Sequence, residues 1–258
     1  AFVDTQQTQD SYELRVTSPS ESKFDWMIGV ARLEATFSTI GAFINGTLFG
    51  ATAGGPAAAS LNPARSGSKT DSIFGSLGYD LTDALNVSIE ARRQKDIITS
   101  GIGLSTQFDV ETTATLPRFL LRYTLNDETN LYANYAKGNQ PTQGYATFFQ
   151  LTPAQQAIAL KNGVSSTAPE AEVENFEFGI KHRAADGSWY LNASVYYLEW
   201  IGRQGVRTIQ VDLNGDGVIT NLPAPAGENF NAVPFAAGDS NTRGLEVDGA
   251  VSLTDKLT

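Results

Sequence analysis

The sequence contains no cysteine and a single histidine, His182. The lack of cysteine excludes disulfides, thiolate zinc sites and cysteine nucleophiles, and one imidazole cannot form a cluster of histidine ligands. The G-x-S-x-G motif that carries the nucleophile of many hydrolases is also missing. Because these absences remove most familiar catalytic chemistry, we expect a protein that is not an enzyme and that requires no cofactor.

Basic side chains are scarce as well. The 258 residues include 18 Lys and Arg against 28 Asp and Glu, which gives a net charge of −10. Such a field repels a phosphate backbone, so we expect no nucleic-acid partner. No stretch reaches the roughly 18 apolar residues of a membrane helix, and the first ten residues do not resemble a signal peptide. The chain is therefore either cytoplasmic and soluble, or a processed or excised piece of an exported protein.

Apolar residues alternate with polar ones along most of the chain. Residues 85–92 show the pattern, with Leu85, Val87 and Ile89 separated by polar side chains. A period of two predicts strands, and we expect about nine, at residues 11–17, 24–30, 73–79, 85–92, 118–125, 131–138, 174–181, 189–199 and 244–253. One short helix is predicted to begin after Thr152, with Pro153, Gln155 and Gly163 as its start and stop signals.

The connections between these strands alternate in length. Short connections rich in Asp, Asn, Gly or Pro fall at residues 18–23, 80–84, 126–130 and 184–188. Long ones fall at residues 35–69, 96–116, 139–173 and 202–241. An ordinary compact domain seldom carries four long loops on alternate connections. A transmembrane β-barrel has this arrangement, with short periplasmic turns and long extracellular loops.

The two faces of the predicted strands support the barrel. Charged residues fall on the face opposite the apolar one, and in a barrel this charged face points into the lumen. They are Glu90, Arg92, Arg118, Arg122, Glu177, Lys181, Glu246 and Asp248. Aromatic residues fall near both ends of the apolar face, as membrane interfaces favour: Trp26, Tyr79, Tyr123 and Trp189 at one end, and Tyr12, Tyr135 and Tyr197 at the other. A soluble β-sandwich, with these aromatics in its core, is the alternative.

Several segments carry a family resemblance. They are LPRFLLRYTLNDETNLYANYAKGNQP (116–141), PEAEVENFEFGIKHRAADGSWYLNASVYYLEW (169–200) and NTRGLEVDGAVSLTDKLT (241–258), with SYELRVTSPSESKFDWMIGV (11–30) and FGSLGYDLTDALNVSIEARR (74–93) before them. In their order and spacing they resemble the β-barrel of a TonB-dependent outer-membrane receptor. The resemblance covers nearly every strand and fails only in the long loops.

The resemblance implies an all-β, antiparallel transmembrane barrel of 22 strands, of which residues 1–258 would supply about nine. Receptors of this kind also have a plug domain and a segment that TonB grips, and neither is found in this sequence. About nine strands would leave two unpaired edges, which lipid does not tolerate. We therefore expect the chain to be a fragment of the barrel domain of a longer receptor.

The same resemblance implies a location in the cell outer membrane and uptake of a scarce ligand, such as a ferric siderophore, cobalamin or an oligosaccharide. Energy would come from the TonB complex through parts of the receptor outside this chain. Outer-membrane lipid and lipopolysaccharide would be further partners. A passive porin or adhesin barrel and a soluble carbohydrate-binding β-domain are the alternatives.

Two features suggest surface sites. Long loops carry Tyr145, Phe148, Phe149, Phe230 and Phe235 beside amide side chains, which suits a ligand with flat apolar faces and hydroxyls. The same aromatics could instead pack the loops against one another. Arg93 and Lys95 follow Ala91 on the lipid-facing side of their strand, so we expect them at the outer headgroups, where they either bind lipopolysaccharide phosphates or are simply solvated.

The last candidate is a calcium loop at residues 212–220. Oxygen side chains or carbonyls fall at the alternating positions of an EF-hand-type loop, with Gly217 at the sharp turn: Asp212, Asn214, Asp216, Val218 and Thr220. Position 12, where a bidentate Glu belongs, is Pro223. A metal-free turn rich in Asn, Asp and Gly is the alternative.

Overall fold

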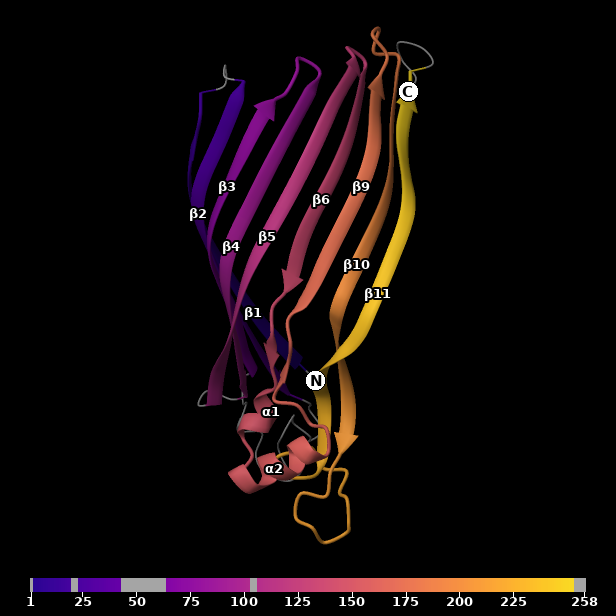
Figure 1. Ribbon diagram of the computed structural model, residues 1–258. Coiled ribbons are helices and arrows are strands. Elements are labelled where there is room, and N and C mark those ends of the chain that lie inside the picture. Colours follow the sequence, from indigo (N-terminus) through magenta and orange to yellow (C-terminus); the bar gives the residue numbers. More distant parts are fainter. Residues whose placement is uncertain (1, 20–22, 43–63, 103–105, 253–258) are drawn as a thin grey trace.

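Nine strands form one curved, fully antiparallel sheet in the computed structural model (Figure 1). The structure describes residues 2–19, 23–42, 64–102 and 106–252. The strands follow one another in the order β1 (Phe2–Thr17), β2 (Phe24–Ala42), β3 (Ala64–Asp80), β4 (Leu85–Ile102), β5 (Thr106–Asn126), β6 (Thr129–Gln140), β9 (Ala171–Arg183), β10 (Trp189–Gln210) and β11 (Asn229–Val251). The predicted number of strands is confirmed, and within the described residues the sheet is open, with β1 and β11 at its edges.

The short connections lie together at one end of the sheet (Figure 1). Their side chains hold the backbone as turn chemistry predicts. The Thr82 hydroxyl accepts the N–H of Leu85 at 3.0 Å, and the Asn126 side chain accepts that of Glu128 at 3.1 Å. Gly187 takes φ +71° in the turn between β9 and β10, a conformation that other residues adopt at a cost. Residues 20–22 of the first predicted turn lie outside the described part.

The strands continue well beyond the ends predicted from apolar alternation. The predicted loop at 96–116 is largely strand, because β4 runs to Ile102 and β5 begins at Thr106. The predicted loop at 202–241 shrinks to residues 211–228, since β10 and β11 stay paired. In these extensions the ladder persists while the side chains become polar, as where Thr99 donates to Asp109 at 2.6 Å. Of the predicted loop at 35–69, residues 43–63 lie outside the described part.

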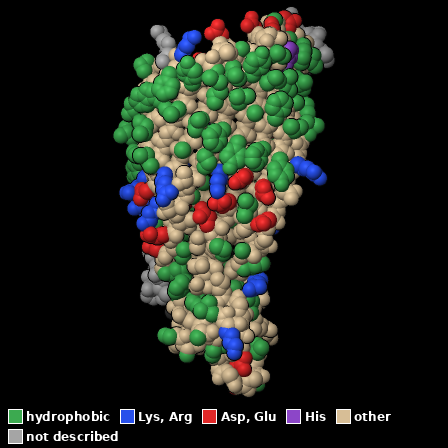
Figure 2. Space-filling model, viewed as in Figure 1, with side chains coloured by type: hydrophobic (Ala, Val, Ile, Leu, Met, Phe, Trp, Pro, Cys, Tyr) green, Lys and Arg blue, Asp and Glu red, His purple; other side chains and the backbone are tan. Residues whose placement is uncertain are grey.

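One face of the sheet is apolar and exposed. Directly paired residues share a face, and Trp26 pairs with Leu77, Leu77 with Ile89 and Ile89 with Phe119. These side chains keep between 37% and 53% of their area exposed. Figure 2 shows a broad band of hydrophobic side chains over the sheet, which is called the hydrophobic belt below. Among the described residues no second sheet covers this belt, as a soluble sandwich would require. None of the helices in the described part is long and apolar enough to cross a membrane.

The remaining elements form a small assembly at the loop end, below the sheet in Figure 1. It contains the strand pair β7 (Gln143–Gly144) and β8 (Thr167–Ala168) and the helices α1 (Ala146–Phe149) and α2 (Pro153–Lys161). The predicted start of α2 is confirmed, since Thr152 and Gln155 form a reciprocal capping box. Gly163 follows the helix with φ +83°, as the predicted stop requires.

Candidate functional site

The polar face of the sheet, opposite the hydrophobic belt, is the candidate site. The register places all eight charged residues predicted for the lumen on this one face, as alternation along each strand requires: Glu90, Arg92, Arg118, Arg122, Glu177, Lys181, Glu246 and Asp248. They form separate small groups on the four strands β4, β5, β9 and β11 rather than one cluster. Such a surface resembles a polar wall more than a catalytic centre.

One group joins β4, β5 and β6. Arg118 Nε donates to Asn134 Oδ1 at 3.0 Å, and its Nη1 lies 3.5 Å from Glu90 Oε2. The side chains of Arg118 and Glu90 keep 46% and 38% of their area exposed. An ion pair this exposed contributes at most about 1 kcal/mol to stability, so its charges remain available to water or to a polar ligand.

A second group joins β6 and β9. The Tyr132 hydroxyl donates to the Glu177 carboxylate, and Lys181 Nζ lies 5.4 Å from the centre of the Tyr132 ring. The ring lies against Gly179, where a Cβ atom would collide with it. Glycine on the polar face therefore allows the tyrosine to lie along the wall and to reach its partner on the next strand.

Two more of the predicted charges, Arg92 and Asp248, make local contacts. Arg92 Nη2 donates to the Ser72 hydroxyl at 2.8 Å, and its guanidinium lies 5.7 Å from the ring centre of Phe74. Asp248 accepts a hydrogen bond from Asn192 at 3.3 Å. The remaining two, Arg122 and Glu246, share the face without a hydrogen bond or ion pair in the described part of the chain.

Sequence reasoning missed a buried polar network farther along this face. Asp96 is only 3% exposed and accepts hydrogen bonds from Thr70 at 2.6 Å and from Gln94 at 2.9 Å. Gln94 also donates to Asn139 at 3.2 Å, and Asn139 donates to Glu170 at 2.7 Å. The apolar pattern predicts loops or their edges at these residues, although the alternation of Arg92, Gln94 and Asp96 on one face indicates that the strand continues.

The loop-end assembly lies over the polar face. The Thr142 N–H donates to the Thr112 hydroxyl at 2.9 Å, and Thr112 pairs with Asp96 on the sheet. The Phe149 ring centre is 4.2 Å from that of Phe108, which points to the same side. The long loop between β6 and β9 thus folds inward across the end of the wall rather than away from it.

Three of the five aromatic residues predicted to contact a ligand are buried. Tyr145, Phe148 and Phe230 are 8%, 5% and 0% exposed in a hydrophobic core shared by the two long loops. The Tyr145 hydroxyl donates to the Asn231 carbonyl at 2.8 Å, and burial raises the pKa of this phenol. This burial agrees with the alternative in which these aromatics pack the loops against one another, and their role in ligand contact stays a prediction.

The other two aromatic residues are accessible. Phe149 is 43% exposed, and the Arg207 guanidinium lies 5.0 Å from the half-buried ring of Phe235. Their role in ligand contact stays a prediction.

The predicted calcium loop is closed by its own hydrogen bonds. The Asp212 carboxylate accepts the N–H groups of Gly215 at 2.6 Å and Gly217 at 2.9 Å. Asp216 accepts from the Val218 N–H at 2.7 Å and from the Asn214 amide at 3.0 Å.

A second anchor lies behind this loop. Glu228 is 4% exposed and accepts the N–H groups of Leu213 at 3.0 Å and of Thr220 at 2.8 Å. Within the described residues no three His, Cys, Asp or Glu side chains converge as metal ligands. Calcium binding at residues 212–220 stays a prediction.

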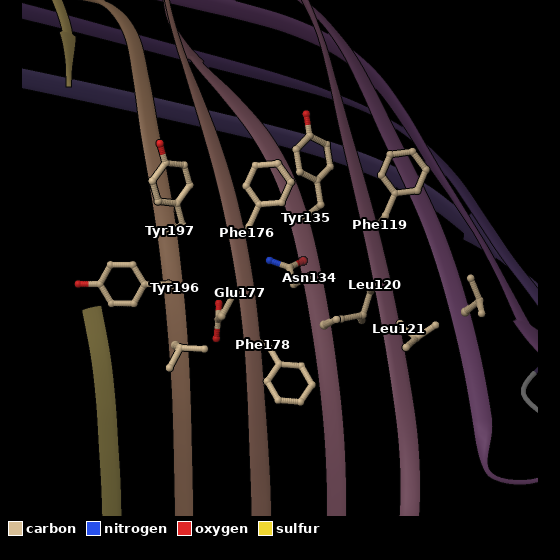
Figure 3. Close-up of a pocket in the computed structure, with 13 residues that line it drawn as sticks. Phe119, Leu120, Leu121, Asn134, Tyr135, Phe176, Glu177, Phe178, Tyr196 and Tyr197 are labelled. Carbon is tan, nitrogen blue, oxygen red and sulfur yellow. The ribbon is translucent and has the colours of Figure 1, made fainter. Parts of the chain in front are cut away.

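A shallow apolar groove of about 630 Å³ lies across β4, β5, β6, β9 and β10. Figure 3 shows the rings of Phe119, Tyr135, Phe176 and Tyr197 following one another across neighbouring strands. The ring centres of Tyr135 and Phe176 are 4.8 Å apart. These residues belong to the exposed apolar face, so the groove is part of the hydrophobic belt and not of the polar wall.

Comparisons with known proteins agree with this geometry. No curated protein matches the sequence. Among solved structures, the chain is similar to the ferric yersiniabactin uptake receptor FyuA from Yersinia pestis, with 14% identity and a TM-score of 0.60 over 98% of this chain and 34% of the receptor. It is also similar to the ferripyoverdine receptor of the Pseudomonas aeruginosa outer membrane, with 17% identity and a TM-score of 0.62 over 98% of this chain and 31% of that one.

A third similar structure is the copper transporter OprC, with 13% identity and a TM-score of 0.62 over 98% of this chain and 37% of the transporter. The chain therefore spans about a third of the length of the structures that it resembles. The family described as "TonB dependent receptor-like, beta-barrel" matches residues 2–258 of the sequence. With its open antiparallel sheet, its apolar outer belt and its polar inner wall, the chain belongs to the β-barrel family of TonB-dependent receptors.

Proposed function

We propose that the chain is part of an outer-membrane receptor that takes up a scarce ligand. The observation that carries the proposal is the division of one sheet into an exposed apolar face and a polar face. In a bilayer the apolar face contacts lipid at little cost, whereas in water it would be an aggregation surface. This weakens the alternative of a soluble carbohydrate-binding domain.

The polar face would line the path of the ligand. Its ion pairs are exposed and separated, so they offer many weak polar contacts and no single tight site. The loop-end assembly lies across this wall, where it can contact a ligand before entry. Phe149 and Phe235 are the accessible aromatics there.

A ferric siderophore is the ligand class that we favour over cobalamin or an oligosaccharide. Two of the similar structures are named as receptors for ferric yersiniabactin and ferripyoverdine, and their likeness to this chain concerns the fold. The ligand must be larger than passive pores admit, and its uptake would use TonB through parts of the receptor outside this chain. A passive porin or adhesin remains the second candidate.

Uptake by the full-length receptor tests the proposal. The receptor is expressed in a Gram-negative host that lacks its own siderophore receptors, in strains with and without TonB, and accumulation of labelled iron is measured with a panel of ferric siderophores. We expect uptake of at least one siderophore only with TonB. Uptake that is equal in both strains would support a passive pore. Failure of the expressed receptor to insert into the outer membrane would contradict a barrel.

Two variants link the result to the polar wall. Arg118→Ala removes the contacts to Glu90 and Asn134 on the polar face, whereas Leu121→Ala removes a side chain from the apolar belt. If the wall conducts the ligand, Arg118→Ala should change the uptake rate at equal receptor abundance and Leu121→Ala should not. The opposite result would place the path elsewhere.

A further inference from the structure

A pocket of about 350 Å³ lies on the polar face near the loop end of the sheet, between strands β1 to β4 and the short strand β7. The register places the strand residues that point into it on the same face as Arg92. Its inward polar and aromatic residues are Gln7, Phe37, Ser66, Ser68 and Ser100, and β7 adds Gln143. The wall and the loop-end assembly therefore form this pocket together.

Gly144 allows β7 to approach the wall closely. A Cβ atom at Gly144 would collide with the ring of Phe108 on β5. Phe108 is paired with Ser100 of the pocket, and its ring centre lies 4.2 Å from that of Phe149. Phe149, which is accessible and predicted to contact a ligand, is therefore close to the pocket.

The lining of the pocket is polar but uncharged. None of the described residues that line it is acidic or basic. Its hydroxyls and amides can donate to and accept from neutral polar groups. The Phe37 side chain is 42% exposed, so a flat apolar surface is also available. The volume is at the low end of the range of about 300 to 1,000 Å³ for small-molecule sites, which suits one arm of a larger ligand.

The wall around the pocket contains no inward cation. A row of paired inward residues crosses β1 to β4 below it, formed by Arg15, Gly29, Phe74 and Arg92. On the loop side of this row, the described inward residues of β1 to β5 include no Lys or Arg. The charged residues among them are Glu13 and Asp96, and both are acidic.

Asp96 is the uncompensated charge of the two. Glu13 lies 3.3 Å from Arg15, whereas Asp96 has no ion pair in the part of the chain that the structure describes. Asp96 is 3% exposed, and it precedes the pocket residue Ile98 by two positions, about 7 Å along the strand. Because a buried charge is poorly screened, it gives the pocket a negative potential.

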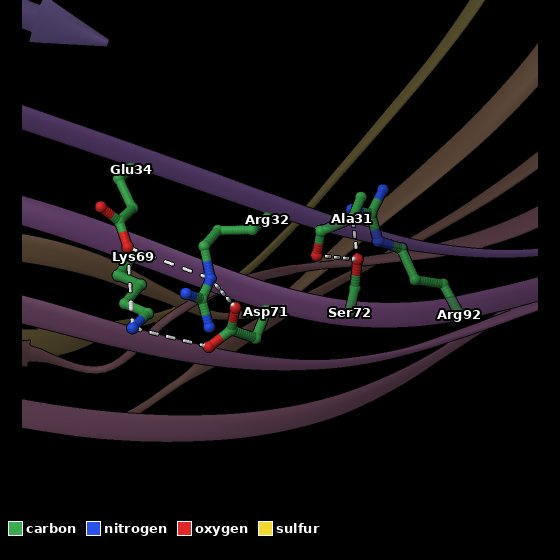
Figure 4. A network of polar contacts seen from close by, with 7 residues as sticks. All are labelled: Ala31, Arg32, Glu34, Lys69, Asp71, Ser72 and Arg92. Carbon is green, nitrogen blue, oxygen red and sulfur yellow. Dashed lines mark hydrogen bonds and ion pairs between the residues drawn. The ribbon is translucent and has the colours of Figure 1, made fainter. Parts of the chain in front are cut away.

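Basic residues of the same strands lie on the other face. The register places Arg93 and Lys95 outward. In the outward network of Figure 4, Arg32 lies 2.6 Å from Asp71, and Lys69 lies 3.6 Å from a glutamate of β2. These cations are therefore not available to a ligand in the lumen.

The loops do not supply an excess of positive charge. Residues 141–170 and 202–239 contain three Lys and Arg against five Asp and Glu. Arg207, one of the three, donates to the Gly163 carbonyl at 2.9 Å. Residues 43–63 and 103–105 contain no charged side chain. The loop end of this chain therefore does not attract an anionic ligand.

Ferric siderophores differ in charge. Three hydroxamate groups, each singly negative, neutralise iron(III), whereas three catecholate groups, each doubly negative, leave three negative charges on the complex. We infer that the ligand is a neutral iron(III) hydroxamate complex with one arm in this pocket. This assignment rests on the proposed function, which makes the ligand a ferric siderophore. The arm's amides would bond to Gln7, Gln143 and the serine hydroxyls, and its methylene groups would lie against Phe37.

Binding to the purified full-length receptor tests the charge preference. Several neutral tris-hydroxamate complexes, a tris-catecholate complex and a neutral maltodextrin are titrated separately by calorimetry. We expect at least one hydroxamate complex to bind ten times more tightly than the other two ligands. Equal or tighter binding of the catecholate complex or of the maltodextrin would overturn the inference, as would no binding of any hydroxamate.

Variants of the pocket test its position. Phe37→Ala should weaken hydroxamate binding about tenfold and Gln143→Ala about threefold, whereas Phe37→Tyr should keep most of the affinity. Phe119→Ala makes the same change to an exposed ring on the outward face and should have no effect. The folded fraction of each variant is checked by circular dichroism. Unchanged affinity in both Phe37→Ala and Gln143→Ala would overturn the pocket assignment.

An added cation tests the electrostatic step. Ser68→Lys places a positive charge in the pocket and should strengthen binding of the tris-catecholate complex about tenfold. Thr113→Lys adds the same charge to the outward face and should not change this affinity. Equal effects of the two lysines would contradict the electrostatic explanation.

The uptake assay separates these outcomes from failure of the proposed function. Uptake of the catecholate complex that depends on TonB, with no uptake of a hydroxamate, would refute only the ligand class. Selective hydroxamate binding with uptake that does not depend on TonB would refute only the coupled uptake.

Discussion

An arginine placed on either face of strand β4 should reveal the orientation of the sheet in a bilayer. Ile89 is on the apolar face and is 48% exposed, and its neighbour Ser88 is on the polar face. Ile89 is four residues beyond Leu85, about 13 Å along the strand. At the usual tilt it lies about 10 Å up an apolar band of about 25 Å, close to the middle.

Ile89→Arg should therefore destabilise the folded receptor by about 2 to 4 kcal/mol, the cost of an arginine near the bilayer midplane. Ser88→Arg adds the same charge to the polar face, where water remains available, and should cost less than about 1 kcal/mol. Ile89→Leu controls for the change of side-chain shape. The free energy of unfolding is measured by urea titration of the full-length receptor folded into lipid vesicles.

The reasoning would be refuted by equal destabilisation in Ile89→Arg and Ser88→Arg. That result would mean that both faces have the same surroundings, as in a soluble domain with water on each side. A larger effect for Ser88→Arg would mean that the apolar face is not the one in contact with lipid. Only a clear excess for Ile89→Arg agrees with a membrane-facing belt.

Three further changes test the wall and the loops. Gly179→Val should lower the free energy of unfolding by about 1 to 3 kcal/mol, because the valine side chain would displace the Tyr132 ring. Gly138→Ala should be neutral, because the space around Gly138 is open. Similar unfolding midpoints for the two variants would contradict this account. Thr152→Ala should remove the cap of α2, costing about 1 kcal/mol, and limited proteolysis should cut that loop faster than in Thr152→Ser. Glu228→Gln should weaken two backbone hydrogen bonds and speed proteolysis of the loop before it, and unchanged digestion would show that the carboxylate is dispensable. The calcium prediction expects slower digestion of the same loop in several millimolar calcium than in chelator, and it fails if the two digestion rates agree.

The architecture was largely readable from the sequence because a barrel strand has a strict period of two. Within the hydrocarbon each outward residue must be apolar, so Leu85, Val87 and Ile89 identify strand, face and register together. Beyond the hydrocarbon this constraint ends, and both faces of a strand can be polar. Sequence reasoning therefore placed a loop at residues 96–116, where the backbone ladder of β4 and β5 in fact continues.

The candidate site was predictable only in part, for a related reason. The charges of the polar wall follow from alternation, which is local in the sequence. The loop core does not, since Tyr145 and Phe230 are distant in the chain and meet only when two long loops fold together. Aromatic residues beside amide residues occur in the sequences of ligand sites and also in those of small hydrophobic cores. The sequence pattern therefore cannot distinguish the two. The contact between Phe149 and Phe108 likewise required the structure.

The buried loop core has a consequence for recognition. Ligand binding is weakened when the binding surface must first become ordered. The cost in binding free energy is about 0.5 to 1.5 kcal/mol for each side chain that is immobilised. Here the Tyr145 hydroxyl ties the loop between β6 and β9 to the Asn231 backbone at the start of β11, and the neighbouring Phe230 is fully buried. A ligand that meets Phe149 and Phe235 would contact loops that are already packed, so the buried aromatics would contribute to affinity by fixing the accessible ones rather than by touching the ligand.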